Sequence, residues 1–438
     1  MADKWGTVRL GDVATINPDA IGANWPFLHI RYIDISSVGE GTIIEKPSQI
    51  SLSEAPSRAK RLIREGDTVL SMVRPNRRSM FFVTTFEPDL VVSTGFAVLR
   101  PKPKVIHPRY LYACVFDRAF TDYLVSREKG AAYPAVLSED IADAKIPFPP
   151  LPEQRAIAHI LGTLDDKIEL NRRMSETLEQ MARALFKAWF VDFEPVRAKI
   201  ECRWQRGQSL PGLPAHFYDL FPERLVDSEL GEIPEGWGVG RLSELIELNP
   251  PRVLRKGEVA PYLDMANMPT RGHVPGDVVD RPFGSGTRFI NGDTLLARIT
   301  PCLENGKTAF VDFLRNGQVG WGSTEYIVLR PREPLPAEFA YCLARSENFR
   351  DFAIQNMTGT SGRQRVQTEA IAHYLLVAPP APVAEAFGRT VKQLFARATR
   401  ASCESRTLAA LRDALLPKLI RGEIRVKDAE KFLQERGL

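Results

Sequence analysis

A seven-residue spacing of apolar side chains runs through residues 151–190. One column of this heptad contains Ile157, Leu164, Asn171, Leu178 and Leu185, and the other contains Ile160, Lys167, Met174, Met181 and Ala188. Such a spacing predicts a long helix that buries one seam against another helix, with a buried Asn that fixes the register at some cost in stability. Pro152 and Glu153 suit its first turn. At 1.5 Å per residue, roughly 38 residues make a rod of about 57 Å.

A second rod follows near the end of the sequence. Its heptad is less regular and comprises Phe387, Leu394, Ala401, Leu408 and Leu415. Pro417 is expected to kink this helix or to end it early. An ordinary bundle core would also explain an apolar seam. Because each half of the sequence supplies only one rod, we expect the two to pack on each other as an antiparallel coiled coil, which would relate the halves by a pseudo-twofold axis.

The two halves are diverged copies of one unit. Short matches recur in the same order about 230 residues apart, as tandem repeats do. The matched pairs are Trp5-Gly6 with Trp237-Gly238, Asn17-Pro18 with Asn249-Pro250, Gly66-Asp67-Thr68 with Gly292-Asp293-Thr294, Ser93-Thr94 with Ser323-Thr324, and Val98-Leu99-Arg100-Pro101 with Val328-Leu329-Arg330-Pro331.

Each copy begins with a mixed α/β (α+β) region. Short β-rich runs at Thr68–Val73, Phe81–Phe86 and Gly95–Arg100 are separated by turn residues, and a helix is predicted over Arg109–Ser126. The predicted organisation is two tandem domains joined by the two helices. The expected ranges are residues 1–150 for the first domain, 151–236 for a long helix plus connector, 237–380 for the second domain and 381–438 for the second long helix.

Composition narrows the class of protein without fixing its partner. The 438 residues are 44% hydrophobic and 26% charged, with a formal net charge of +4, which is typical of a globular chain. No apolar run approaches the ~18 residues of a membrane span. Five scattered cysteines without a CxxC pair favour a reducing, cytoplasmic location. The charge is so nearly balanced that any nucleic-acid surface must be local.

Several motifs resemble the specificity subunits of type I restriction-modification systems. These are the run from Pro149 to Ile157 (PPLPEQRAI) with Leu164–Glu169 (LDDKIE), Ala188–Phe193 (AWFVDF), Ser228–Trp237 (SELGEIPEGW) and the ending Leu415–Ile424 (LLPKLIRGEI). The resemblance covers nearly the whole sequence, and its domain order agrees with the duplication.

The resemblance implies two target-recognition domains, each reading one half of a split double-stranded DNA sequence. The long helices would bind two copies of an adenine-N6 methyltransferase subunit, which holds S-adenosylmethionine. A restriction subunit driven by ATP would translocate and cut DNA. On this view the chain has no catalytic residue, metal or cofactor of its own.

Two motifs could argue for chemistry in this chain. Asn249-Pro250-Pro251 is similar to a motif of adenine methyltransferases, but Arg252 stands where that motif needs an aromatic residue to stack on a flipped base. Asn305–Thr308 ends like a phosphate-binding loop, but Pro301 replaces its first glycine. We interpret both as turns. A self-sufficient DNA-modifying enzyme, or a coiled-coil scaffold without a DNA role, stays open as an alternative.

Candidate DNA-binding residues fall on loops that differ between the copies. Arginine suits phosphate and guanine, and Asn or Gln suits adenine. The candidates of the first copy are Arg58, Lys60, Arg61, Arg74, Asn76, Arg77, Arg78 and Tyr133, and those of the second are Arg298, Lys307, Arg363, Gln364 and Arg365. Because the frameworks agree while these loops differ, we expect two unlike half-sites and an asymmetric bipartite target. Solvated basic loops are the alternative explanation.

Three aromatic residues near the end of the first rod remain ambiguous. Trp189, Phe190 and Phe193 are more apolar than a solvent-facing helix tolerates. They predict either an interface with the methyltransferase partner or a packed core.

Overall fold

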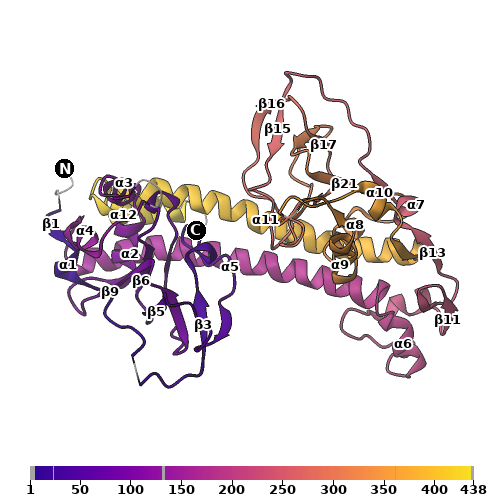
Figure 1. The fold of residues 1–438 in the computed structure, drawn as a ribbon, viewed down its shortest axis with the longest axis horizontal. Coiled ribbons are helices and arrows are strands. Elements are labelled where there is room, and N and C mark those ends of the chain that lie inside the picture. Colours follow the sequence, from indigo (N-terminus) through magenta and orange to yellow (C-terminus); the bar gives the residue numbers. More distant parts are fainter. Residues whose placement is uncertain (1–4, 23, 131–133, 361, 436–438) are drawn as a thin grey trace. The chain divides into compact units, whose positions relative to one another are not determined.

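The computed structural model describes residues 5–22, 24–130, 134–360 and 362–435. The chain divides into two compact units. Unit 1 comprises Met1–Ile168 and Arg406–Leu438, and unit 2 comprises Glu169–Ser405. Two long helices, α5 (Leu151–Phe190) and α11 (Ala381–Ile420), each contribute one end to unit 1 and the other to unit 2 (Figure 1).

Unit 1 contains two four-stranded sheets, with strand orders β2-β9-β6-β7 and β4-β3-β8-β5, and a two-stranded sheet β1-β10. The strands are β1 (Thr7–Arg9), β2 (Ala14–Ile16), β3 (His29–Ile33), β4 (Ser48–Ser51), β5 (Ala59–Leu62), β6 (Thr68–Ser71), β7 (Met80–Phe82), β8 (Leu90–Ser93), β9 (Phe96–Pro101) and β10 (Lys145–Pro147). The β-rich runs predicted from the sequence are thus confirmed as β6, β7 and β9, with shifted ends.

Unit 2 repeats this topology with sheets β14-β21-β18-β19, β16-β15-β20-β17 and β13-β24. The strands are β11 (Leu225–Ser228), β12 (Gly231–Pro234), β13 (Gly238–Arg241), β14 (Ile246–Leu248), β15 (Val259–Leu263), β16 (Val279–Pro282), β17 (Thr287–Phe289), β18 (Thr294–Ala297), β19 (Thr308–Phe310), β20 (Gly320–Gly322), β21 (Tyr326–Pro331), β22 (Met357–Thr358), β23 (Arg365–Val366) and β24 (Leu375–Ala378).

Pairing directions agree between the two units. In unit 1 the pair β3–β8 is parallel within sheets that are otherwise antiparallel, and in unit 2 the equivalent pair β15–β20 is parallel. Thr68 faces Leu99 in the first copy, and Thr294 faces Leu329 in the second. This identity of strand order, direction and register confirms the internal duplication that the sequence predicts.

Short helices cover the sheets and close the connections. They are α1 (Leu10–Val13), η1 (Ile35–Ser37), η2 (Pro75–Arg77), α2 (Pro108–Phe116), α3 (Arg118–Val125), α4 (Ser138–Asp143), α6 (Glu194–Ile200), η3 (Ala215–Leu220), α7 (Leu242–Leu245), α8 (Ala337–Ala344), α9 (Glu347–Gln355), α10 (Thr368–Ala372) and α12 (Val426–Gln434). The helical stretch predicted near Arg109–Ser126 is confirmed, but it consists of two helices, α2 and α3. Asp117 has extended backbone and its carboxylate accepts from the amide of Ala119, so it ends α2 and caps α3.

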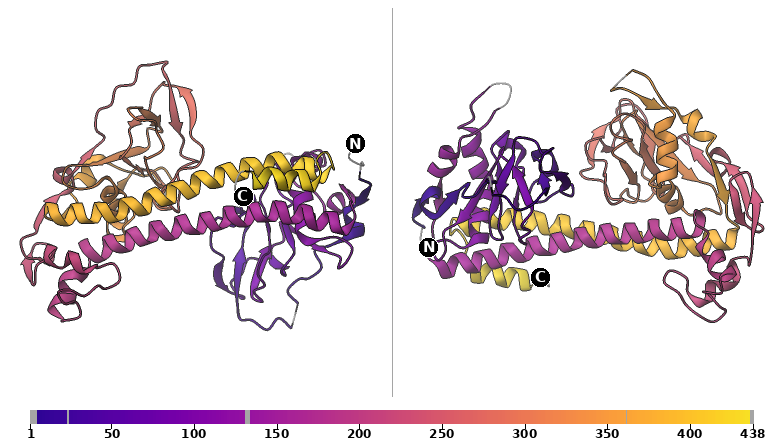
Figure 2. Two further views of the ribbon diagram at one scale, coloured as in Figure 1. Left: turned by 180° about the vertical axis from the view of Figure 1, so that it is seen from behind. Right: turned by 60° about the horizontal axis from the view of Figure 1, so that its bottom comes forward.

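The long helices pack against each other with opposite chain directions. In unit 2, Asn171 contacts Glu404 and Phe186 contacts Phe387, so residue numbers rise along α5 while they fall along α11. In unit 1, Leu164 and Leu408 belong to the same buried cluster. Both views in Figure 2 show α5 (magenta) and α11 (yellow) side by side within each unit.

The predicted seam is correct for one column and wrong for part of the other. Asn171 and Leu178 are buried as expected, but Met181 is 49% exposed. Ala182 and Phe186 are buried in its place. A straight helix drifts about 20° per heptad, so in unit 2 the buried face follows the ordinary helical period. On α11, Pro417 lies inside the helix, which ends three residues later at Ile420.

The aromatic residues at the end of α5 form core packing within unit 2. Trp189 is 1% exposed and meets Phe217 and Phe221 edge to face, with ring centroids 5.5 and 5.1 Å apart. Phe190 and Phe193 are buried in the same cluster. The prediction that Trp189, Phe190 and Phe193 bind a partner is therefore corrected, because distant aromatic residues of the same unit already cover them.

No helix among the described residues is both long and apolar enough to cross a membrane.

Candidate nucleic-acid interface

In each unit, the segment after a central strand pairs with a segment from far along the chain. In unit 1, Val73 forms a β-bridge with Ala135, and the amide of Val136 donates to Met72 O at 3.0 Å. In unit 2, Ile299 forms the same bridge with Arg365, and the amide of Val366 donates to Arg298 O at 3.0 Å. The two junctions share one backbone framework and carry different side chains.

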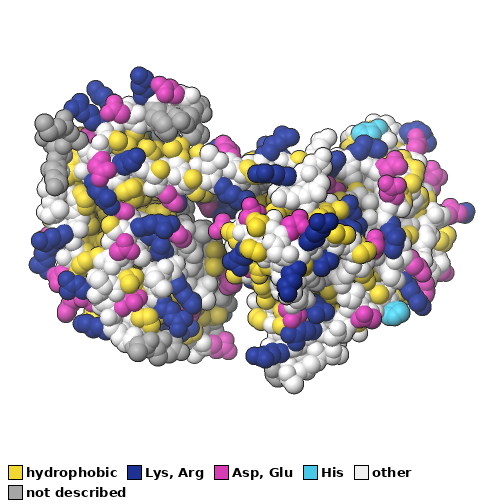
Figure 3. All heavy atoms as spheres, turned by 90° about the horizontal axis from the view of Figure 1, so that it is seen from above, with side chains coloured by type: hydrophobic (Ala, Val, Ile, Leu, Met, Phe, Trp, Pro, Cys, Tyr) yellow, Lys and Arg dark blue, Asp and Glu magenta, His cyan; other side chains and the backbone are white. Residues whose placement is uncertain are grey.

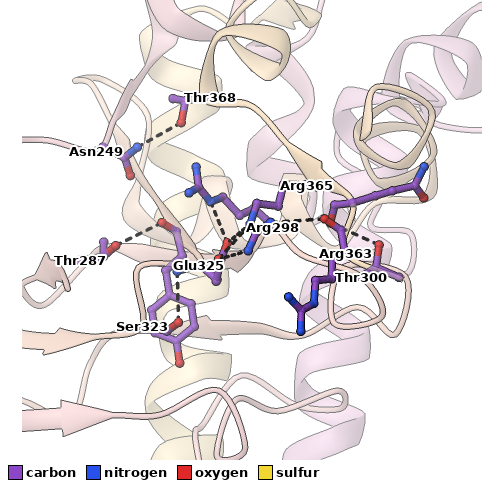
Figure 4. A network of polar contacts seen from close by, with 11 residues as sticks. Asn249, Thr287, Arg298, Thr300, Ser323, Glu325, Arg363, Arg365 and Thr368 are labelled. Carbon is purple, nitrogen blue, oxygen red and sulfur yellow. Dashed lines mark hydrogen bonds and ion pairs between the residues drawn. The ribbon is translucent and has the colours of Figure 1, made fainter. Parts of the chain in front are cut away.

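The unit 2 junction brings together candidates that are more than sixty residues apart in sequence. Arg298 follows β18, Gln364 precedes β23 and Arg365 lies on it. Thr300 donates its backbone N–H to Gln364 O at 3.0 Å. Arg363 is exposed beside them. Figure 4 shows Arg298 and Arg365 turned towards Glu325, while the side chain of the neighbouring Arg363 points away from it. This is the densest grouping of candidate DNA contacts in unit 2.

Glu325, which the sequence reading did not select, organises this group. Its carboxylate accepts from Arg365 Nε at 2.9 Å, from Arg365 Nη2 at 2.7 Å and from Arg298 Nε at 3.2 Å (Figure 4). The hydrogen bond from Arg365 lowers the pKa of Glu325 against the opposing effect of burial, and Arg298 lowers it further. Glu325 follows Ser323-Thr324, a matched pair in the duplication, so comparing the copies could have revealed it opposite Gly95.

Lys307 points into its own domain. The side chain is half-buried and its ammonium donates to Met265 O at 2.6 Å. In the same turn, the amide of Gly306 donates to Leu303 O at 2.9 Å. This N–H group is therefore used within the turn and does not point towards a ligand. The phosphate-loop likeness is therefore a structural turn, and Lys307 is corrected from a DNA contact to a residue that holds this turn.

In unit 1 the basic loop folds as the short helix η2. Asn76 and Arg77 are exposed on it, whereas Arg74 is half-buried and its amide donates to Pro134 O at 2.8 Å. Asn76 and Arg77 are thus placed to reach a ligand. The candidate Tyr133 lies outside the described residues.

Arg78 does not share that exposure. Its backbone is in the left-handed region (φ 53°), which turns its side chain inward. The guanidinium donates to Thr121 Oγ1 at 2.5 Å, to Phe116 O at 2.6 Å and to Glu40 Oε1 at 2.8 Å. The expectation that Arg78 reads DNA is corrected, because its donors are committed to holding η2 against the helices.

The remaining basic candidates of unit 1 lie at or near the edge strand β5. Arg58 is exposed and donates to Asp34 Oδ2 at 2.6 Å, and Lys60 is exposed beside it. Arg61 instead turns inward to Asn17 Oδ1 and Phe96 O, and burial lowers the pKa of its guanidinium. Arg58 and Lys60 therefore remain candidates for DNA contacts, while Arg61 is corrected to a structural residue.

The asparagines of the two Asn-Pro motifs form hydrogen bonds with backbone amides in their own units. Asn17 and Asn249 have positive φ (52° and 48°), and the side-chain oxygen of each accepts from the amide of Val98 or Val328 at 2.9 Å. This matches the interpretation of Asn249-Pro250-Pro251 as a turn. Among the described residues, no three His, Cys, Asp or Glu side chains form a group that could hold a metal ion.

Basic side chains are dispersed among acidic and apolar ones on the face that Figure 3 shows. The chemistry available is therefore local: forked arginine donors and an exposed Asn on two loops, suited to base edges and phosphates.

Comparison with known proteins decides among the classes of protein left open by this geometry. A family model described as "Type I restriction modification DNA specificity domain" matches residues 2–180. The HindI type I restriction enzyme specificity subunit of Haemophilus influenzae is 24% identical, over 85% of this chain and 90% of its own length. The MjaIX specificity subunit of Methanocaldococcus jannaschii is 26% identical, over 97% of this chain and 89% of its own length. Over most of its length, the chain is thus similar to type I restriction enzyme specificity subunits.

A solved structure supports the same fold. The type I restriction-modification S subunit from M. genitalium aligns with a TM-score of 0.51 at 13% identity, over 95% of this chain and 96% of that chain. The resemblance of the motifs to specificity subunits is confirmed by the family model and the relatives. The chain has mixed α/β units together with a packed pair of long helices.

Proposed function

We propose that the chain is the DNA-reading subunit of a type I restriction-modification complex and that it recognises an asymmetric bipartite sequence. The observation that carries this proposal is the pair of junctions described above. One backbone framework presents Asn76 and Arg77 in unit 1 and Arg298, Arg363 and Arg365 in unit 2. Equal frameworks with unlike loops suit two target-recognition domains that read different bases.

The chain directs chemistry that its partners perform. Two methyltransferase subunits, which bind S-adenosylmethionine, assemble on the helical region, and a restriction subunit uses ATP to translocate and cut DNA. The chain itself supplies no catalytic residue and no cofactor. Similarity to type I specificity subunits supports this division of roles.

We expect α5 and α11 to act as a spacer between the two half-sites, since each of these 40-residue helices belongs partly to unit 1 and partly to unit 2. Inserting two heptads into both helices should lengthen the gap between the half-sites and leave the bases read unchanged. A gap that stayed constant would contradict the role of these helices as a spacer.

Mapping N6-methyladenine in cells that express the chain with its methyltransferase partner tests the proposal. The expected motif has two different half-sites separated by a fixed number of unread bases. A palindromic motif would contradict the asymmetry. Methyl transfer by the purified chain alone would instead favour a self-sufficient enzyme. DNA affinity that falls steeply with salt would speak against a scaffold without a DNA role.

A further inference from the structure

An ion cluster at the unit 2 junction has no counterpart in unit 1. Two arginines, Arg298 and Arg365, meet the single carboxylate of Glu325. The positions equivalent to these three residues in unit 1 are Met72, Gly95 and Ala135, because Met72 donates its amide to Gly95 O just as Arg298 donates its amide to Glu325 O. No charge remains at those three positions in unit 1.

The cluster is not needed to form the junction itself. The β-bridge between Val73 and Ala135 closes the unit 1 junction without any ion, and the bridge between Ile299 and Arg365 has the same form. The backbone hydrogen bonds therefore suffice for the fold. An arrangement of three charged side chains that the framework does not require calls for another role.

The contacts of Arg365 leave one edge of its guanidinium available. Nε and Nη2 lie on the carboxylate of Glu325, and Nη1 donates to Arg363 O at 3.3 Å. A guanidinium has five N–H donors in a rigid planar fork. With the Nε edge held by Glu325, the edge formed by Nη1 and Nη2 faces away from the carboxylate, and 36% of the side chain is exposed.

The cluster also has the charge that DNA requires. A lone glutamate near a phosphate backbone would repel it, but two guanidinium groups and one carboxylate leave a net charge of +1. Arg298 uses Nε towards Glu325, so it offsets the carboxylate while Arg365 is held. A planar arginine fork that is fixed in this way matches O6 and N7 of guanine.

We propose that Glu325 is a positioning residue that fixes Arg365 to read a guanine in the half-site of unit 2. The proposal rests on the DNA-reading function proposed above. It assigns a base to unit 2 and predicts that unit 1 reads its half-site without such a cluster.

The test uses the complex of the full chain with its methyltransferase partner. The N6-methyladenine motif is mapped for the wild type and for Arg365→Lys, Glu325→Gln and the control Arg332→Lys, an exposed arginine just beyond the opposite end of β21. One guanine of the second half-site should become degenerate in both cluster variants. The first half-site should stay unchanged, and Arg332→Lys should match the wild type.

A second measurement separates base reading from loop stability. The guanine is replaced by 7-deazaguanine in a synthetic duplex, which removes the N7 acceptor. Wild-type affinity should fall, by no more than the roughly 5- to 150-fold that a whole bidentate arginine–guanine contact contributes, because O6 remains as an acceptor. In Arg365→Lys the same replacement should have little further effect, because the contact has already been lost.

Three outcomes would overturn the assignment. They are a second half-site without guanine, motifs unchanged in both cluster variants, and effects of Arg365→Lys and 7-deazaguanine that simply add. Each of these outcomes can occur while the wild-type motif remains bipartite. Failure of the proposed function would instead show as the absence of any bipartite motif. The two failures are therefore distinguishable. A thermal unfolding midpoint equal to that of the wild type confirms that Arg365→Lys is folded.

Discussion

The amide of Asn171 donates to the carboxylate of Glu404 at 2.8 Å, which links α5 to α11 within unit 2. Asn171 is 1% exposed and lies between apolar residues of the helical seam. A buried amide at such a position specifies one register, and it does so at a cost in stability.

We predict that Asn171→Leu raises the free energy of unfolding by about 1 kcal/mol, because an apolar side chain of similar size replaces a buried polar group. Urea denaturation followed by circular dichroism measures the change. Asn171→Ala is the control and should lower stability, since it leaves a cavity. A loss of stability in Asn171→Leu would show that the amide contributes more than its burial costs.

A second prediction concerns the buried carboxylate that joins α5 to α8. Glu179 and Arg345 are both buried, with 3.6 Å between Glu179 Oε1 and Arg345 Nε, and Tyr341 Oη lies 3.1 Å from the same oxygen. Glu179→Gln should lower the free energy of unfolding by about 3 kcal/mol, because it leaves a buried guanidinium without a counter-charge.

The matched control for that change is Tyr341→Phe. It removes a hydroxyl that donates to Gly272 O at 2.7 Å and should lower the free energy of unfolding by only about 1 kcal/mol. Denaturant titration of both variants gives the comparison. Equal losses of unfolding free energy in the two variants would mean that the charge of Glu179 makes no separate contribution to stability.

The adjacent arginines Arg77 and Arg78, at the end of η2 and just after it, should separate recognition from stability. Arg77→Ala removes an exposed cation, so we expect weaker DNA binding and a shallower dependence of the binding constant on salt, by about one unit of slope. The thermal unfolding midpoint should stay that of the wild type. Filter binding across a salt series measures the slope.

Arg78→Ala removes the guanidinium that bonds Thr121, Phe116 and Glu40. It should lower the free energy of unfolding by about 2 kcal/mol, because each buried hydrogen bond to a charged group contributes about 1.5–3 kcal/mol and some of these groups regain water. A change in salt slope without a change in stability would reverse the roles assigned to Arg77 and Arg78.

The pKa of Glu325 predicts a pH dependence with a definite sign. The hydrogen bond from Arg365 holds this pKa below its ordinary value of 4.5. The ionised carboxylate therefore contributes stability above about pH 4.5, and this contribution is lost as the pH falls through the lower folded-state pKa.

Measuring the free energy of unfolding from about pH 7 to about pH 3 for the wild type and Glu325→Gln tests this sign. The difference between the two proteins should be largest near neutrality and should shrink in acid. A difference that is constant over the whole range would show that the ionisation of Glu325 does not contribute to folding.

The periodic features of this protein could be predicted from its sequence. The heptads identify α5 and α11, and the ordered matches identify the duplication, because both depend on spacing along the chain. Met181 is exposed although the heptad predicts its burial. In unit 2 the buried face of α5 follows the ordinary helical period of about 3.6 residues, which a strict heptad does not describe.

The side-chain assignments could be predicted only in part. Arg77 and Arg78 are neighbours of the same type, and their opposite placement depends on a left-handed residue and on Glu40, thirty-eight positions away. Trp189 is covered by Phe217 and Phe221 through a connector with no periodic pattern. These contacts arise from tertiary packing, so local sequence does not specify them.

Unit 1 is built from both the beginning and the last part of the chain, since Arg406–Leu438 completes what Met1–Ile168 starts. Unit 2 is one uninterrupted segment. During synthesis on the ribosome, unit 2 has all of its residues before unit 1 does, although unit 1 emerges first. Residues 1–168 therefore lack their packing partner, and the apolar face of α5 in unit 1 stays uncovered, until residues 406–438 leave the exit tunnel.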